Sequence, residues 1–293
     1  MPRLAFLGTP DVAAQSLGLL FEAGFEIPLV VTQPDARRGR GKETTPSPVK
    51  VKAQELGIGV SHVLGDLADV DVDGAVVVAY GALIPDKILG LMPMVNLHFS
   101  LLPRWRGAAP LERAILAGDK ETGVCVMEVV SELDAGGVYA THRTEIANKT
   151  LDVLRRELCD AGTQMVIDLL VGGVGGLPLP QAQVGEQSYA KKLTVEDGRL
   201  NFGRTVRENL AVVRLGAAYC FSGTKRLKIL EATTGAPMNG SPGEVIENNV
   251  CCADGTLALV TVQPEGGKAM DSGAWLRGRG DRASMRLTSH PES

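Results

Sequence analysis

Cysteine, net charge and long apolar runs are all scarce in this sequence, and each shortage excludes a class of protein. The five cysteines are an odd number with no CxxC spacing, which disfavours a disulfide framework or a zinc site and predicts reduced thiols. Uncharged stretches such as 74–85 and 169–185 are too short, or too rich in Gly and Pro, to span a bilayer. The N-terminus meets Gly8–Asp11 too early for a signal peptide. We therefore expect a cytoplasmic protein without a metal site.

The net charge is small and unevenly distributed. The chain carries 30 Lys and Arg against 34 Asp and Glu. Residues 204–293 hold 11 of the cations and 9 of the anions, whereas residues 1–203 hold 19 and 25. A polyanionic partner would have to be recognised by local basic patches, because the field of the whole protein does not attract it.

The first half of the chain alternates short apolar runs with helical patterns. Strands are predicted over 4–7, 27–32, 75–79, 94–99, 124–130 and 138–146, and helices over 12–23, 49–56, 108–117 and 151–169. This alternation is typical of an α/β domain whose doubly wound, mostly parallel (Rossmann-like) sheet is covered on both faces. In such a sheet the ligand lies beyond the carboxyl ends of the strands.

The last third of the chain has a different pattern. Short apolar runs are separated by turn pairs such as Ser222-Gly223 and Asp254-Gly255, which is typical of a small β-barrel or sandwich. We predict a first domain over 1–185, a linker over 186–203 and a small β-barrel or sandwich domain over 204–293.

Three polar residues alternate with apolar ones where the strand 94–99 ends: Asn96, His98 and Ser100. A period of two places them on one face of the strand, which meets the ligand crevice at the carboxyl end. An amide donor beside an imidazole could stabilise a developing oxyanion and move a proton. A single histidine in a strand is also often only structural.

Asp134 supplies a carboxylate just after the predicted strand 124–130, at what we expect to be the same edge of the sheet. Gly136 and Gly137 follow it and allow a sharp turn. An aspartate in a turn often has no other role. If Asp134 meets His98, however, it would orient the imidazole and hold a proton on it.

A basic loop follows the second strand. Arg37, Arg38, Arg40 and Lys42 lie within six residues and are spaced by glycines. Flexible cations of this kind suit phosphate groups. A solvated loop is the equally good alternative, because charged runs are usually solvated surfaces.

The motifs also resemble a known family. Asn96–Pro103, with Leu133–Gly136 downstream, resembles the signature of formyltransferases that use 10-formyltetrahydrofolate. Further segments, in the same order along the chain, resemble the branch of this family that acts on methionyl-tRNA. They are Phe6–Asp11, Gln33–Asp35 with the basic loop, Arg104–Pro110, Tyr189–Leu193 and Gln263–Met270. The likeness runs from about residue 3 to about residue 280.

The resemblance implies a fold and a reaction. It implies a doubly wound formyltransferase domain followed by a small OB-like barrel that contacts the tRNA backbone. It implies formyl transfer from 10-formyltetrahydrofolate to the α-amino group of methionine on initiator tRNA, which supports translation initiation. It also implies a monomer that needs no metal, with Asn96, His98 and Asp134 as the catalytic residues.

The resemblance further implies two sets of binding residues. The folate site would be lined by Val77, Ala79, Tyr80, Gly81, Ser100, Leu101, Leu102, Pro103 and Asp134. The tRNA would be bound by Arg37, Arg38, Arg40, Lys42, Lys191 and Lys192.

Two rival functions share parts of this pattern. Formyltransferases acting on amino-sugar nucleotides or glycinamide ribotide share the Asn-x-His and Asp residues but need no basic loop. A catalytically idle tRNA-binding protein would keep the fold, although the intact Asn96, His98 and Asp134 argue against it. Residues 213–223 depart from the family's usual Pro- and Trp-bearing turn, so we expect altered packing or tRNA contact there.

Overall fold

The computed structural model describes residues 1–37, 44–279 and 285–292. The chain folds into two compact units. The first comprises residues 1–111, 121–145 and 153–191, and the second comprises 112–120, 146–152 and 192–293.

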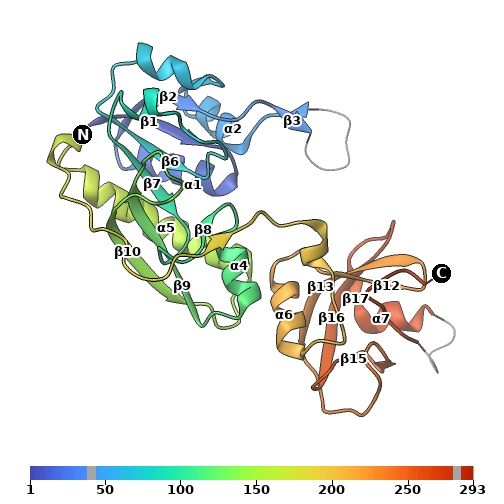
Figure 1. Ribbon diagram of the computed structural model, residues 1–293. Coiled ribbons are helices and arrows are strands. Elements are labelled where there is room, and N and C mark those ends of the chain that lie inside the picture. The colour runs from blue at the N-terminus through green and yellow to red at the C-terminus, as the bar shows by residue number, and fades with distance from the viewer. Residues whose placement is uncertain (38–43, 280–284, 293) are drawn as a thin grey trace. The chain divides into compact units, whose positions relative to one another are not determined.

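A seven-stranded sheet forms the centre of the first unit (Figure 1). Its strands lie in the order β10 (Val138–Glu145), β9 (Glu121–Glu128), β7 (Met94–His98), β6 (Gly74–Val78), β1 (Arg3–Gly8), β2 (Glu26–Val31) and β5 (Gly59–Ser61). The five strands from β7 to β5 pair in parallel, whereas β9 is antiparallel to both of its neighbours. The predicted mostly parallel sheet is therefore confirmed, with β9 as the exception.

Four helices lie where the apolar pattern predicts them: α1 (Asp11–Glu22), α2 (Pro48–Glu55), α4 (Pro110–Ala117) and α5 (Leu151–Leu170). A short α3 (Asp86–Leu89) was not predicted. The start of α2 is set locally, because the Ser47 hydroxyl accepts the Lys50 N–H at 3.0 Å and Pro48 occupies the first turn. Gly162 lets α5 lie close to the sheet, since a Cβ there would lie 2.9 Å from Val124.

Every residue of β6 is buried, as expected for a strand covered on both faces. Leu7, Val31 and Val77 belong to one apolar cluster of this unit. Each such side chain contributes about 1.5–3 kcal/mol when fully buried. The buried sheet thus supports the residues at the carboxyl ends of its strands.

The second unit is built on an antiparallel sheet. Its strands are ordered β12 (Tyr219–Ser222), β13 (Lys225–Thr234), β16 (Thr256–Pro264), β15 (Asn249–Cys251) and β14 (Val245–Ile246), with β17 (Met270–Asp271) paired to β16. The chain end closes this sheet, because the Phe221 N–H donates to the Thr288 carbonyl at 2.8 Å and the Val245 N–H donates to the Met285 carbonyl at 2.9 Å. Both edge strands are thereby covered, which gives the predicted small barrel.

Two helices of the second unit were not predicted, α6 (Val206–Arg214) and α7 (Ser272–Arg277). The turn-rich pattern predicted the strands of this unit but did not locate these helices. Thr205 and Glu208 form a capping box that starts α6, and Val206 and Val213 are buried in the apolar core. The Thr-x-x-Glu spacing could have revealed α6 from the sequence.

The atypical stretch 213–223 is well packed. Val213, Ala218 and Cys220 are buried in the core cluster of the second unit, and the Arg226 guanidinium lies 3.8 Å from the Tyr219 ring centroid. The departure of this stretch from the family's usual turn therefore does not remove it from the core.

Within the described ranges, no helix is long and apolar enough to cross a membrane.

Candidate active site

His98 is the last residue of β7 and its side chain is only 5% exposed. It pairs with Cys125 of β9, and Asn96 pairs with Met127. Because successive side chains alternate between faces, Asn96 and His98 share one face of the sheet, as predicted. Ser100 follows in the turn, where it is fully buried and its hydroxyl donates to the Arg104 carbonyl at 2.6 Å.

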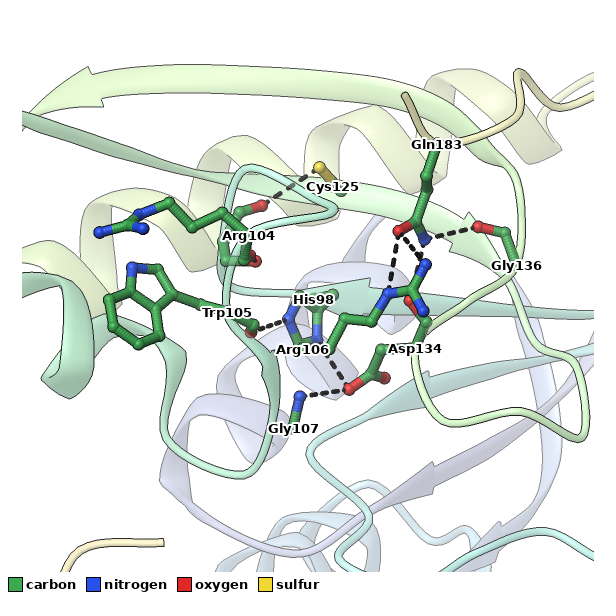
Figure 2. Close-up of polar contacts among 10 residues, drawn as sticks. His98, Arg104, Trp105, Arg106, Gly107, Cys125, Asp134, Gly136 and Gln183 are labelled. Atoms are coloured by element: carbon green, nitrogen blue, oxygen red, sulfur yellow. Dashed lines mark hydrogen bonds and ion pairs between the residues drawn. The ribbon is translucent and has the colours of Figure 1, made fainter. Parts of the chain in front are cut away.

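The His98 ring lies between a carbonyl and a carboxylate (Figure 2). Its Nε2 lies 2.9 Å from the Trp105 carbonyl oxygen. A carbonyl only accepts hydrogen bonds, so Nε2 carries a hydrogen. Its Nδ1 faces Asp134 Oδ2 at 3.6 Å, slightly beyond a direct hydrogen bond. His98 and Asp134 therefore do meet in the structure.

Two backbone positions hold this arrangement in place. Asp134 has φ +50° and Trp105 has φ +64°, both in the left-handed region that non-glycine residues rarely adopt. The Gly107 N–H donates to Asp134 Oδ2 at 2.7 Å, and Gly107 itself has φ +109°. Such strain persists only where the surrounding structure enforces it. Here it points the Trp105 carbonyl and the Asp134 carboxylate at one ring.

Asp134 reaches His98 by a route that the sequence did not predict. Both residues were expected beyond carboxyl ends at one edge of a parallel sheet. Instead β9 is antiparallel to β7, and Glu128 at its carboxyl end pairs with Val95 near the start of β7. The loop 129–137 must therefore return along β7 to bring its carboxylate to His98. Gly136 permits the return, because a Cβ there would lie 2.0 Å from the Glu128 carbonyl oxygen.

Arg106 is a buried cation beside this loop, only 7% exposed. Its Nε and one terminal nitrogen donate to Gln183 Oε1 at 3.1 and 2.8 Å. Its other terminal nitrogen donates to Glu132 at 3.2 Å and to Gln187 at 3.0 Å. A buried charge is tolerated only when it is paired and hydrogen-bonded in this way.

The segment around Ser188 supports the same loop from the other side. Arg106–Gly107 (β8) pairs in parallel with Tyr189–Ala190 (β11). The Trp105 N–H donates to the Ser188 hydroxyl at 2.9 Å, and the Arg106 N–H donates to the Ser188 carbonyl at 2.8 Å. Sequence reasoning missed Gln183, Gln187 and Ser188, because these contacts join positions about 80 residues apart and leave no local signal.

Apart from Asp134, the predicted folate residues lie at the end of β6 and in the turns that follow β6 and β7. Val77 of β6 pairs with Asn96 of β7. Ala79 follows at φ +45° and Gly81 at φ +85°, so the chain turns sharply where β6 ends. The buried Tyr80 accepts a hydrogen bond from the Thr9 hydroxyl through its carbonyl, at 2.8 Å. Leu101, Leu102 and Pro103 form the turn between Ser100 and Arg104.

The predicted tRNA residues are only partly described. Arg37 is exposed in β3 (Ala36–Arg37), which pairs with β4 (Thr44–Thr45). Arg38, Arg40 and Lys42 lie outside the described residues. Lys191 and Lys192 are exposed and follow β11.

Cys125 does not supply a nucleophile beside His98. Burial raises the pKa of its thiol, and the thiol donates to the Ser100 carbonyl at 3.1 Å. A protonated, buried thiol is unreactive.

Burial also raises the pKa of the Tyr80 hydroxyl. In the described part of the chain, no three His, Cys, Asp or Glu side chains are grouped to hold a metal ion.

The sequence matches a known family across both units. Residues 3–170 match the formyl transferase family, and residues 192–280 match the formyl transferase C-terminal domain. The methionyl-tRNA formyltransferase of Jannaschia sp. (strain CCS1) is 38% identical over 292 residues, covering 94% of this chain and 96% of that protein.

Solved structures share the fold. HypX from Aquifex aeolicus gives a TM-score of 0.66 at 19% identity over 94% of this chain, and the chain covers 47% of HypX. The methionyl-tRNA formyltransferase from Clostridium thermocellum gives a TM-score of 0.59 at 18% identity, covering 80% of this chain and 94% of that one. At these identities the likeness concerns the fold alone.

The fold and the sequence match together define a two-domain formyl transferase. Within that class, the chain belongs to the methionyl-tRNA formyltransferase family.

Proposed function

We propose that this protein transfers the formyl group of 10-formyltetrahydrofolate to the α-amino group of methionine on initiator methionyl-tRNA. The observation that carries the proposal is the buried His98–Asp134 pair on the same face as Asn96, at the end of β7. The family supplies the substrate class. The reaction would support translation initiation in the cytoplasm, and five free, buried thiols agree with a reducing compartment.

The reaction makes one C–N bond and breaks another. The methionine amine attacks the formyl carbon and loses a proton, while the departing nitrogen gains one. Negative charge develops on the formyl oxygen between these events. The site must therefore stabilise an oxyanion and move a proton over a short distance.

We assign the oxyanion contact to the Asn96 amide and the proton to the His98–Asp134 pair. One oxyanion donor is typically worth about 3 kcal/mol, and positioned proton transfer about 10²–10⁴-fold in rate. Because Nε2 donates to Trp105, the proton belongs on the Nδ1 side, facing Asp134 across 3.6 Å. Asp134 holds that Nδ1 proton electrostatically. The carboxylate accepts the proton that the amine loses, directly or through water, and the His98–Asp134 pair returns one proton to the departing nitrogen.

The co-substrate would be held by the turn 77–81 and by the turn 100–103. The first turn fits this role because Val77 pairs with Asn96, so its backbone lies beside the reactive face. When bound, 10-formyltetrahydrofolate supplies the activated formyl group. The residues of the two turns orient it toward Asn96 and His98 and exclude water.

We assign tRNA contacts to Arg37, Lys191 and Lys192, to the basic residues 38–42, and to the second unit. We propose that the protein acts as a monomer. Phosphate contacts should make affinity fall with salt, with a log–log slope of about 0.7–0.9 for each neutralised phosphate. Lys192→Gln should lower that slope without changing the rate of transfer at saturating tRNA.

Single-turnover formyl transfer tests the proposal, with methionyl initiator tRNA, free methionine and an amino-sugar nucleotide as acceptors. We expect product on the tRNA alone. Transfer to a small amine but not to tRNA would contradict the assigned substrate and favour the amino-sugar class. Binding of tRNA without transfer to any acceptor would contradict the enzymatic role.

A further inference from the structure

Gln183 occupies a junction between two loops of the active site (Figure 2). Its Oε1 accepts two hydrogen bonds from Arg106, at 3.1 and 2.8 Å. Its Nε2 donates to the Asp134 and Gly136 carbonyls, at 2.8 Å each. A glutamine amide has two lone pairs on its oxygen and two hydrogens on its nitrogen, so all four of its bonding positions are used.

We propose that Gln183 is a positioning residue that fixes the Asp134 carboxylate opposite His98. It touches neither His98 nor the carboxylate, and it acts through the backbone carbonyls on both sides of Ala135. This inference rests on the proposed formyl transfer, because that reaction gives the His98–Asp134 pair its role.

The backbone of Asp134 explains why such a residue is needed. At φ +50° the backbone lies in the left-handed region that non-glycine residues rarely adopt, so the loop needs outside contacts to hold this conformation. The carboxylate is held by the Gly107 N–H, and the backbone is held by Gln183. Arg106 fixes the orientation of the Gln183 amide, because only the oxygen can accept from a guanidinium. The nitrogen is thereby directed at the two carbonyls.

Gln183→Glu separates the two halves of this junction. The shape and both acceptor bonds to Arg106 are kept, but the two donor bonds are replaced by oxygen facing two carbonyl oxygens. We expect kcat to fall by about 10–100-fold with little change in KM, since a displacement of about 1 Å in a catalytic group can cost 10²-fold.

Gln187→Glu is the matched control. Gln187 also accepts from Arg106, at 3.0 Å, and it lies on the same segment with an exposed side chain. The substitution adds the same charge beside the same guanidinium. We expect kcat within about twofold of the unmodified protein, as is usual for surface substitutions.

A double-mutant cycle shows whether Gln183 acts through Asp134. In an Asp134→Asn background, Gln183→Glu should lower the single-turnover rate by less than about threefold, because residues acting as a unit are not additive. A general structural role would give the same loss in both backgrounds.

Amide exchange followed by NMR reports the position of Asp134 without any reaction. The Gly107 N–H donates to Asp134 Oδ2, whereas the Ala108 N–H donates to the Ala190 carbonyl at 2.9 Å. Gln183→Glu should speed exchange at Gly107 by about tenfold or more and leave Ala108 as an internal reference.

Three results would overturn the inference: an unchanged kcat in Gln183→Glu, equal losses in both backgrounds, or unchanged exchange at Gly107. Failure of the proposed function has a different signature, since the unmodified protein would then transfer no formyl group to methionyl initiator tRNA. In that case the exchange measurement still decides whether Gln183 places Asp134.

Discussion

The two units of this protein differ in where non-glycine residues adopt a positive φ. Among the described residues, five non-glycine positions have positive φ, and three of them, Ala79, Trp105 and Asp134, lie at the candidate active site of the first unit. The other two, Ala147 and Glu247, lie in ordinary turns of the second unit. Strain in the first unit is therefore concentrated where the chemistry is expected.

Buried polar groups differ in the same way. In the described part of the second unit the buried polar side chains are neutral, namely Asn209, Asn249, Thr256 and Ser272. The first unit buries the His98 imidazole and the Arg106 guanidinium. Burying such groups destabilises a fold unless every contact is satisfied. The first unit therefore buries ionisable side chains at its candidate site, and their hydrogen bonds are what makes this burial tolerable.

The strongest test of this contrast is His98→Ala. Loss of the imidazole should lower the single-turnover transfer rate by about 10³-fold, because proton transfer and charge stabilisation are both removed. Thermal unfolding of the second unit should be unchanged, and this serves as the control for folding. Transfer at the unmodified rate would show that His98 is only structural.

The complementary test is Ile229→Ala in the second unit, where Ile229 is fully buried in the core cluster. The substitution should lower the free energy of unfolding by about 2–5 kcal/mol, through lost transfer free energy and the cavity left behind. Urea unfolding followed by circular dichroism measures it. A loss below about 1 kcal/mol would mean that this core is not tightly packed.

A smaller effect is expected from relieving strain in each unit. Ala79→Gly and Glu247→Gly each replace a left-handed residue, at φ +45° and +57°, and should raise the free energy of unfolding by up to about 1 kcal/mol. Only Ala79→Gly should raise KM for the formyl donor, because the freed turn no longer holds it. Equal kinetic effects of the two variants would remove the contrast drawn here.

The smallest effect concerns Asp197, whose carboxylate accepts from Arg113 at 2.7 Å and from the Thr194 N–H at 2.7 Å. Burial opposes its ionisation, but these contacts outweigh burial and hold the pKa of Asp197 below its usual range. Its contribution to stability is therefore present above about pH 4 and lost as the pH falls through the lowered pKa.

Asp197→Asn should therefore lower stability at pH 7 by less than about 1 kcal/mol, the range of a partly exposed ion pair. The difference from the unmodified protein should shrink below pH 4. Thermal unfolding at pH 3, 5 and 7 measures it. A difference that grows toward low pH would contradict the assignment.

Local signals predicted the elements of the first unit well. The pattern of apolar residues located β1, β6 and β7 to within one residue at each end. The core of β1 and all of β6 are continuous apolar runs, as expected for strands covered on both faces. The helix α6 was missed although its capping box was visible, because the turn pairs of the last third suggested only strands. Both outcomes depend on interactions between residues close in sequence.

The sequence by itself determined that Asn96 and His98 share a face, because side chains alternate along any strand. It also placed a carboxylate and two glycines in one loop. Only the tertiary structure decided how Asp134 meets His98, since β9 is antiparallel to β7 and the loop must turn back. Only the tertiary structure brought Gln183 to that loop, because a hydrogen bond across 49 residues leaves no periodicity in the sequence. Periodic patterns encode local geometry, whereas the register of distant segments is set by the packing of the whole unit.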